Sequence, residues 1–215
     1  MIISRGRSYI FVHIPKTGGT SLALALEARA MKDDILIGDT PKARRRRQRL
    51  KSLSARGRLW KHSTLRDIDG LVAPAELEAL FTCTLVRNPW DRAVSYYHWL
   101  RLQRFDHPSV TLSKRLTFEA FLLHPDTLAS FRCNPYASYM TDATGTERCD
   151  AFIRIEHFEL DAEPLWQHLG FALEMPHTNR SERLGDYRSY FTTEMVDALA
   201  EACADDIQRL HYQFD

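Results

Sequence analysis

Short apolar runs rich in β-branched and aromatic residues alternate with longer segments whose apolar positions recur at helical spacing. The short runs predict strands near residues 8–14, 34–38, 81–87 and 151–155. The longer segments predict helices near residues 20–31, 42–53, 74–80, 89–103, 117–123, 160–169 and 193–209. Strands that alternate with helices are typical of parallel sheets covered on both faces. The pattern therefore predicts a three-layer α/β fold with a central, mainly parallel sheet flanked by helices.

The loop after the first predicted strand combines a cation, two glycines and several hydroxyls. It reads Pro15-Lys16-Thr17-Gly18-Gly19-Thr20-Ser21 and leads directly into a predicted helix. A helix N-terminus offers free N–H groups and the positive end of the helix dipole, and glycines let an anion approach the backbone closely. The loop is thus typical of a phosphate cradle. Its lysine precedes the glycines, unlike G-x-x-x-x-G-K-[ST], and a plain Gly-Gly turn with a solvated lysine is the alternative.

A second candidate anion site begins where another predicted strand ends. Arg87-Asn88-Pro89-Trp90-Asp91-Arg92-Ala93-Val94-Ser95 follows the strand near residues 81–87. Asn88 is a good N-cap and Pro89 suits the first helical position. Helical spacing places Asn88, Arg92 and Ser95 on one face, so Arg87 and Ser95 together could hold a phosphate. Alternatively, Arg87 pairs with Asp91 and Ser95 only packs the helix.

Together these two segments resemble the fingerprint of sulfotransferases that use 3′-phosphoadenosine 5′-phosphosulfate (PAPS), the group that includes heparan and chondroitin sulfate O-sulfotransferases and bacterial family 2 proteins. The resemblance implies a P-loop-like fold in which Pro15–Ser21 holds the 5′-phosphosulfate and Arg87–Ser95 holds the 3′-phosphate. It extends more weakly to Phe152-Ile153-Arg154 before Glu156 and to Asn179-Arg180-Ser181 before Tyr187. The donor-binding residues implied are Pro15, Lys16, Thr17, Gly18, Gly19, Thr20, Ser21, Arg87, Ser95 and Arg180, with 3′,5′-adenosine bisphosphate (PAP) as product.

Sulfuryl transfer to a hydroxyl needs positioning, charge stabilisation on the bridging oxygen and a base for the acceptor proton. Lys16 suits the bridging oxygen. Among nine histidines, His62 lies between the two donor motifs and matches the position of the relatives' catalytic histidine, although Ser63 follows it where they often have glycine. His98 is the second candidate base, and His13 is expected to be structural.

Cysteine spacing does not indicate a metal site. Cys83, Cys133, Cys149 and Cys203 form no C-x-x-C motif, so we expect free thiols and metal-free chemistry, with a bridge between Cys133 and Cys149 left open.

The chain of 215 residues, 44% of them hydrophobic, fits a single sulfotransferase domain spanning residues 1–215. It contains no apolar run of signal or membrane length, which favours a cytoplasmic, bacterial enzyme without a membrane anchor. The net charge is +1, yet residues 42–58 hold nine Lys or Arg and no acid, which leaves 1 − 9 = −8 for the rest. Such a run is either a solvated helix face or a grip for an acidic partner.

We therefore predict transfer of a sulfuryl group to a hydroxyl acceptor, with a carbohydrate as the expected class and no nucleic-acid partner. Residues 104–116 and 134–146 are predicted to be loops, and either could cover the acceptor. The rival enzyme is a nucleotide kinase or NTPase, which would need magnesium and bind ATP tightly. The rival from another class is a basic glycan- or nucleic-acid-binding module, which would tolerate loss of Lys16 and fail on loss of Arg44–Arg47.

Overall fold

The computed structural model describes residues 1–176 and 185–215. The chain divides into two compact units. The first unit comprises Met1–Val86 and Tyr136–Thr178, and the second comprises Arg87–Pro135 and Asn179–Asp215. The expectation of a single domain stays a prediction.

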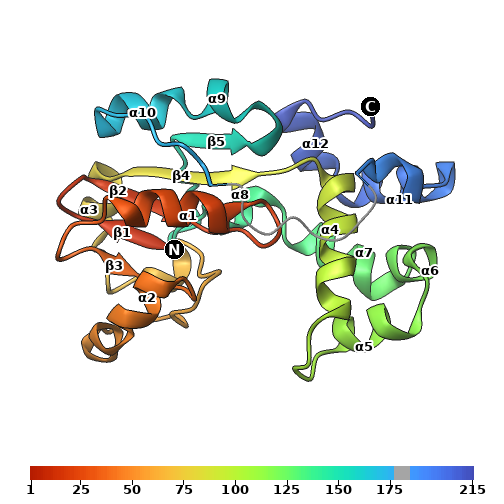
Figure 1. The fold of residues 1–215 in the computed structure, drawn as a ribbon, viewed down its shortest axis with the longest axis horizontal. Helices are drawn as coiled ribbons and strands as arrows, with labels where there is room; N and C mark the ends of the chain where they lie inside the picture. Colours follow the sequence, from red (N-terminus) through yellow and green to blue (C-terminus); the bar gives the residue numbers. More distant parts are fainter. Residues whose placement is uncertain (177–184) are drawn as a thin grey trace. The chain divides into compact units, whose positions relative to one another are not determined.

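The first unit is built on a five-stranded sheet with the strand order β3-β1-β2-β4-β5 (Figure 1). Its strands are β1 (Ile2–Ser4), β2 (Tyr9–Val12), β3 (Ile35–Leu36), β4 (Phe81–Val86) and β5 (Ala151–Arg154). β2, β4 and β5 pair in parallel, whereas β1 runs antiparallel to both β2 and β3. Four strands therefore share one direction, as predicted, and β1 was missed because three residues are too few to show a period.

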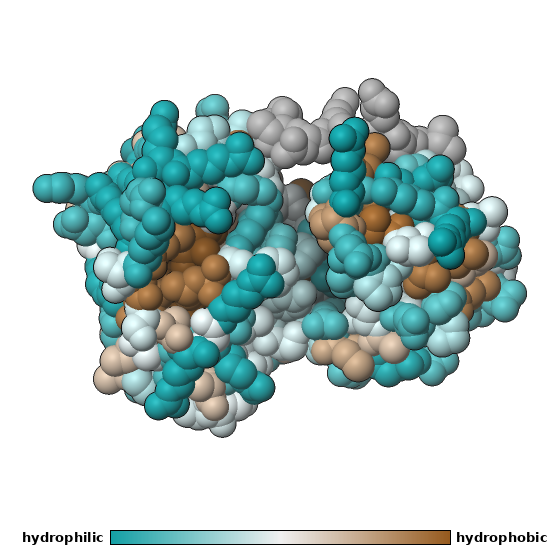
Figure 2. Space-filling model, turned by 90° about the horizontal axis from the view of Figure 1, so that it is seen from below, coloured by the Kyte–Doolittle hydropathy of each residue, from teal (hydrophilic) through white to brown (hydrophobic). Residues whose placement is uncertain are grey.

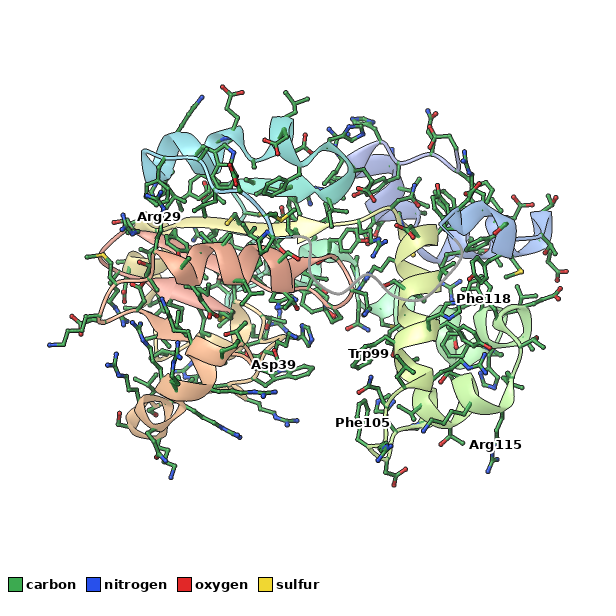
Figure 3. All side chains as sticks on the ribbon, in the orientation of Figure 1. Arg29, Asp39, Trp99, Phe105, Arg115 and Phe118 are labelled. Atoms are coloured by element: carbon green, nitrogen blue, oxygen red, sulfur yellow. The ribbon has the colours of Figure 1, made fainter. Side chains whose placement is uncertain are left out.

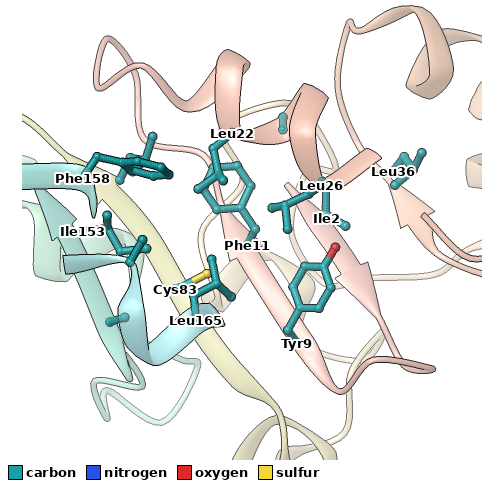
Figure 4. Close-up of a cluster of buried hydrophobic side chains, with 14 of the residues drawn as sticks. Ile2, Tyr9, Phe11, Leu22, Leu26, Leu36, Cys83, Ile153, Phe158 and Leu165 are labelled. Atoms are coloured by element: carbon teal, nitrogen blue, oxygen red, sulfur yellow. The ribbon is translucent and has the colours of Figure 1, made fainter. Parts of the chain in front are cut away.

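Helices and loops cover both faces of this sheet, which confirms the predicted α/β architecture. On one face, Phe11 and Ile153 pack with Leu22 of α1 (Gly19–Ala28) and Leu165 of α10 (Glu163–Leu169), next to the short α9 (Phe158–Asp161) (Figure 4). The opposite face packs against α3 (Pro74–Ala79) and the 3-10 turn η2 (Arg66–Ile68). The remaining elements of the unit are α2 (Pro41–Arg46), η1 (Arg47–Ser52), α8 (Tyr136–Tyr139) and η3 (Ile155–His157).

The described part of the second unit is helical. Its elements are α4 (Pro89–Arg101), α5 (Pro108–Arg115), α6 (Phe118–Leu122), α7 (Pro125–Cys133), η4 (Tyr187–Tyr190), α11 (Thr193–Ala202) and α12 (Ala204–Leu210). Aromatic side chains form much of its interior, where Tyr97 of α4 contacts Phe118 and Phe121. Figure 3 shows Phe118 beside α4, from which Trp99 also projects.

The prediction of a loop over residues 104–116 is wrong, because α5 occupies most of it. The His107 side chain accepts a hydrogen bond from the Ser109 N–H, and Pro108 stands at the first helical position. Val110 and Ser113 are buried along the helix. Histidine is a rare N-cap, so this helix has no strong start signal in the sequence. The second predicted loop, residues 134–146, holds the short α8, and Tyr136 and Met140 are buried there.

Among the described residues, no helix is long and apolar enough to cross a membrane. Nor does the described part of the chain contain a cluster of three or more His, Cys, Asp or Glu side chains that could hold a metal ion. All four cysteines are free thiols.

Candidate anion-binding loop and histidine pair

The predicted phosphate loop connects β2 to α1 in the first unit. Its backbone turns through the left-handed region at Lys16 (φ 66°) and Gly18 (φ 85°). The buried Thr17 hydroxyl donates to the Ile14 carbonyl at 3.0 Å, which holds the turn together. Gly18 is the N-cap of α1, and because it has no side chain, no hydroxyl or carboxylate at that position covers the first N–H groups of the helix. No side chain therefore caps the N-terminus of α1, which begins within the loop.

Neighbouring side chains leave no room for a Cβ at either glycine of the loop. A Cβ on Gly18 would lie 2.3 Å from Ile155 Cδ1, and one on Gly19 would lie 2.4 Å from His13 Cδ2. The loop is therefore wedged between the residue that follows β5 and the imidazole that follows β2. This packing fixes the backbone path without using side chains of the loop itself.

Replacing Gly18 by alanine is expected to destabilise the protein and to weaken anion binding. The left-handed φ alone costs a non-glycine residue about 1 to 2 kcal/mol, and crowding against Ile155 adds about 1 to 3 kcal/mol. Gly145→Ala is a matched control, because Gly145 has φ 86° but open space around it. Urea denaturation and a phosphate-ligand titration of both variants would check this. Equal losses of stability and affinity in the two variants would contradict the packing argument.

His62, the predicted base, is held by His13, which lies between β2 and the loop. Its Nδ1 lies 2.7 Å from the His13 carbonyl oxygen. A carbonyl can only accept, so Nδ1 carries the proton and Nε2 keeps its lone pair. The His62 ring also makes edge contacts with His13, at 4.9 Å between centroids, and with Trp60, at 5.2 Å. The structure therefore joins His62 to the loop through His13, which contacts both His62 and Gly19.

Both histidines are held neutral. Burial lowers the pKa of His62 to about 4, against the hydrogen bond to the His13 carbonyl, and the positive charge of Lys61 lowers it further. Burial also lowers the pKa of His13 well below its ordinary value, with the Met1 amino group, His62, Lys61 and Lys16 acting in the same direction. At neutral pH the His62 ring is consequently in the form that can accept a proton.

The depressed pKa of His62 predicts a loss of stability in acid. His62 takes up a proton near pH 6.5 in the unfolded chain and only near pH 4 in the folded chain. Its contribution to the free energy of unfolding is therefore complete above pH 6.5 and is lost as the pH falls toward 4. We expect about 2 kcal/mol of it to be gone by pH 5. Urea denaturation of wild type and His62→Gln at pH 7.5, 6 and 5 isolates this share from Lys61, Asp39, His13 and the Met1 amino group, which face the ring. Parallel pH curves for the two proteins would contradict it.

The second predicted motif opens the second unit. Asn88 caps α4 as predicted, accepting from the Trp90 N–H at 3.1 Å, and its amide donates to the Gln213 carbonyl. Arg87 Nε donates to Asp91 Oδ2 at 2.6 Å, and each side chain is 16% exposed. Ser95 is buried. The ion pair that the sequence offered as an alternative is thus present, and a ligand role for Arg87 and Ser95 stays a prediction.

The structure brings part of the predicted site together. Pro15, Lys16, Thr17, Gly18, Gly19, Thr20 and Ser21 form one loop, and His62 reaches it through His13. Arg87 and Ser95 belong to the other compact unit. Arg180 lies outside the described residues. His98 contacts Tyr97 and Tyr190 in the second unit. His13 was expected to be structural. It also contacts the His62 ring and lies against Gly19, and the sequence signal for these contacts was its position shortly before the loop.

No protein-family model matches the chain, and no curated protein matches it significantly. Among solved structures, the crystal structure of mouse sulfotransferase SULT7A1 complexed with PAP is similar to it. The two chains are 16% identical, the match covers 96% of this chain and 86% of the mouse chain, and the TM-score is 0.47.

Proposed function

We propose that the protein is a PAPS-dependent sulfotransferase that moves a sulfuryl group to a hydroxyl, with a carbohydrate as the acceptor. The observation that carries the proposal is that His13 contacts both the candidate anion-binding loop and the neutral His62. The loop supplies Lys16 and an uncapped helix N-terminus, and His13 links it to His62. The sequence adds the Arg87–Ser95 segment, the other half of the family fingerprint.

The residues of the loop fit the phosphosulfate end of the donor. The space that a Cβ would fill at Gly18 and Gly19 is closed on the inner side by Ile155 and His13, so the backbone itself forms the cradle. N–H groups at the start of α1, the Lys16 ammonium and the hydroxyls of Thr20 and Ser21 are the groups that would hold it. Thr17 would contribute through its backbone, because its hydroxyl already donates to Ile14. The donor, when bound, supplies the sulfuryl group and the leaving phosphate.

In this proposal His62 removes the acceptor proton. The His13 carbonyl keeps the ring proton on Nδ1, so the lone pair on Nε2 is the one available to a hydroxyl. Lys16 stabilises the negative charge that develops on the bridging oxygen. Anionic charge held at the loop favours the protonated imidazole and so raises the pKa of His62 from its low value, which makes the ring a stronger base at the step where it is needed.

Arg87 and Ser95, with Arg180, are proposed to hold the 3′-phosphate. Arg87→Ala should then weaken binding of 3′,5′-adenosine bisphosphate by about 10- to 150-fold, the loss of one charge-assisted contact, and leave adenosine 5′-monophosphate nearly unaffected. Isothermal titration with both nucleotides measures the difference. Asp91→Asn is the control, because it breaks the Arg87–Asp91 ion pair and retains the guanidinium. Equal weakening of both nucleotides by Arg87→Ala would refute the assignment.

The proposal is tested with sulfur-labelled PAPS and a panel of hydroxyl acceptors, in buffer with EDTA. We expect labelled product to form in EDTA and to be inhibited by 3′,5′-adenosine bisphosphate, while ATP with magnesium competes poorly. Strict dependence on magnesium, with tight binding of ATP, would instead indicate a nucleotide kinase or NTPase. Failure of the wild-type protein to bind the bisphosphate at all would end the sulfotransferase proposal.

A further inference from the structure

The candidate base lies in a closed loop of the first unit, residues 56–69, whose two ends are joined. The Arg56 N–H donates to the Asp69 carbonyl at 2.8 Å. The Gly57 N–H donates to the Asp67 carbonyl at 3.0 Å, and a Cβ on Gly57 would lie 2.4 Å from Asp67 Cα. A loop whose ends meet in this way is packed by its own side chains. The orientation of the candidate base can therefore be set from within the loop.

Ser63 is fully buried inside this loop. Its hydroxyl donates to the Arg58 carbonyl at 2.8 Å and to the Trp60 carbonyl at 2.9 Å, and it accepts from the Trp60 N–H at 2.9 Å. A hydroxyl has one proton and two lone pairs, so the two carbonyls share the proton and the N–H uses a lone pair. The Ser63 N–H also donates to the Trp60 carbonyl, at 3.0 Å. Ser63 therefore closes the turn of residues 58–63, in which His62 lies.

The residues that Ser63 holds are connected to the imidazole of His62. The Trp60 ring makes an edge contact with the His62 ring, at 5.2 Å between centroids. The Arg58 guanidinium lies 5.5 Å from the centre of the Trp60 ring. The other ring that contacts His62 is that of His13, at 4.9 Å. Of the two rings against the imidazole, one thus belongs to a residue whose backbone is bonded to Ser63.

Burial alone does not fix the Trp60 ring, which is 43% exposed. Lys61, the next residue, pairs at 3.0 Å with Asp39, which directly precedes the N-cap of α2 (Figure 3 labels Asp39). Figure 2 views the molecule from the side on which α2 lies in Figure 1 and shows mostly hydrophilic side chains there around a recessed apolar area. A ring with few buried contacts keeps one orientation only if its backbone is held. Ser63 holds this backbone at both its N–H and its carbonyl.

We infer that Ser63 is a positioning residue for His62: through Trp60, its hydroxyl holds the imidazole in the orientation that leaves the Nε2 lone pair available. In that orientation Nδ1 lies 2.7 Å from the His13 carbonyl oxygen. A ring that turns away from this carbonyl loses the bond that fixes its tautomer, and the Nδ1–H and Nε2–H forms then interchange. For the reaction in which His62 takes part, the inference rests on the proposed function.

Two other roles for Ser63 give different expectations. A direct part in the chemistry is excluded, because the residue is fully buried and its hydroxyl already bonds three backbone groups. A purely structural part would make loss of the hydroxyl destabilise the loop and leave the His62 ring of the folded protein unchanged. The state of that ring in the folded protein is therefore the quantity to measure.

The experiment compares Ser63→Ala with Ser113→Ala. Ser113 is also fully buried, and its hydroxyl donates to the Val110 carbonyl at 3.0 Å in the second unit. Nitrogen-15 NMR of the histidine rings, with His62 assigned from the signals missing in His62→Gln, reports the tautomer and its titration. Wild type and control should keep the proton on Nδ1, with a His62 pKa of about 4. Ser63→Ala should show both tautomers and a pKa raised to about 5, because water then reaches the ring.

Turnover separates a positioning role from a structural one. Ser63→Ala should slow single-turnover transfer from PAPS by about tenfold to a hundredfold, the effect of a misplaced catalytic group, and leave bisphosphate affinity within about twofold. In a His62→Ala background the same change should slow transfer by less than about twofold further, because no base is left to position. The titratable groups that face the ring are the same in these proteins: Lys61, Asp39, His13 and the Met1 amino group.

Trp60→Ala is the second variant, in case Ser63→Ala does not fold. It removes a half-exposed ring, keeps Ser63, and should show the same mixture of His62 tautomers. Unchanged His62 signals in either folded variant would overturn the inference, as would equal changes in Ser113→Ala or additive losses of rate with His62→Ala. If the His62 signals change as expected but wild type transfers no sulfuryl group from PAPS, the positioning of the ring stands and the proposed function fails.

Discussion

Replacing His62 by alanine is expected to slow sulfuryl transfer by about a hundredfold to ten-thousandfold, the usual contribution of a general base. Binding of 3′,5′-adenosine bisphosphate should stay close to that of wild type, because the His62 ring contacts His13 and Trp60 and is not part of the phosphate loop. Single-turnover rates with labelled PAPS and a titration of the bisphosphate measure the two effects separately.

The matched control is His98→Ala, which removes the other candidate base from the second unit. We expect it to retain turnover, provided that thermal unfolding shows it to be folded. Wild-type turnover in His62→Ala with a verified acceptor would instead place the base elsewhere, and His98 and Glu156 would be tested next.

Replacing Lys16 by alanine is expected to lower both affinity and rate. Loss of a charged contact to the donor should weaken bisphosphate binding by about tenfold to a hundredfold. Loss of charge stabilisation on the bridging oxygen should slow transfer by a further factor of about 10² to 10³. Alanine keeps a Cβ at φ 66°, so the backbone strain of this position is the same in both proteins and the difference reports the ammonium.

Lys16→Arg keeps the charge and serves as the control, with partial recovery of affinity expected. The comparison of the two alanine variants tests the proposed mechanism. We expect His62→Ala to lower the rate without the affinity, and Lys16→Ala to lower both. A Lys16→Ala protein with unaltered affinity and rate would show that the loop is a plain turn with a solvated lysine.

The sequence predicted the parts of the fold that follow from periodicity. The strands ending before His13 and Arg87 and the helices beginning at Gly19 and Pro89 all lie where the apolar pattern and the capping residues place them. β1 was missed because three residues show no alternation. α5 was missed because its N-cap is a histidine, whose capping by Nδ1 has no strong sequence signature.

The site was predictable only as a set of residue types. The motif predicted which residues form the loop, but the contacts of Gly18 with Ile155 and of Gly19 with His13 join segments far apart in sequence and depend on side-chain packing. The neutral state of His62 likewise depends on burial, which a single position in a sequence does not reveal. The bonds of Ser63 depend on the positions of the Arg58 and Trp60 carbonyls, which the sequence does not reveal.

The imidazole of His13 lies against both Gly19 of the loop and the His62 ring, so neither can be changed independently of His13. A larger residue at position 19 would demand a smaller one at position 13, and that change would withdraw the edge contact from the His62 ring. Substitutions at Gly19, His13 and His62 should therefore be strongly non-additive. Changes at these three positions should therefore be tolerated only in combination, and a library that varies residue 19 must vary residue 13 along with it.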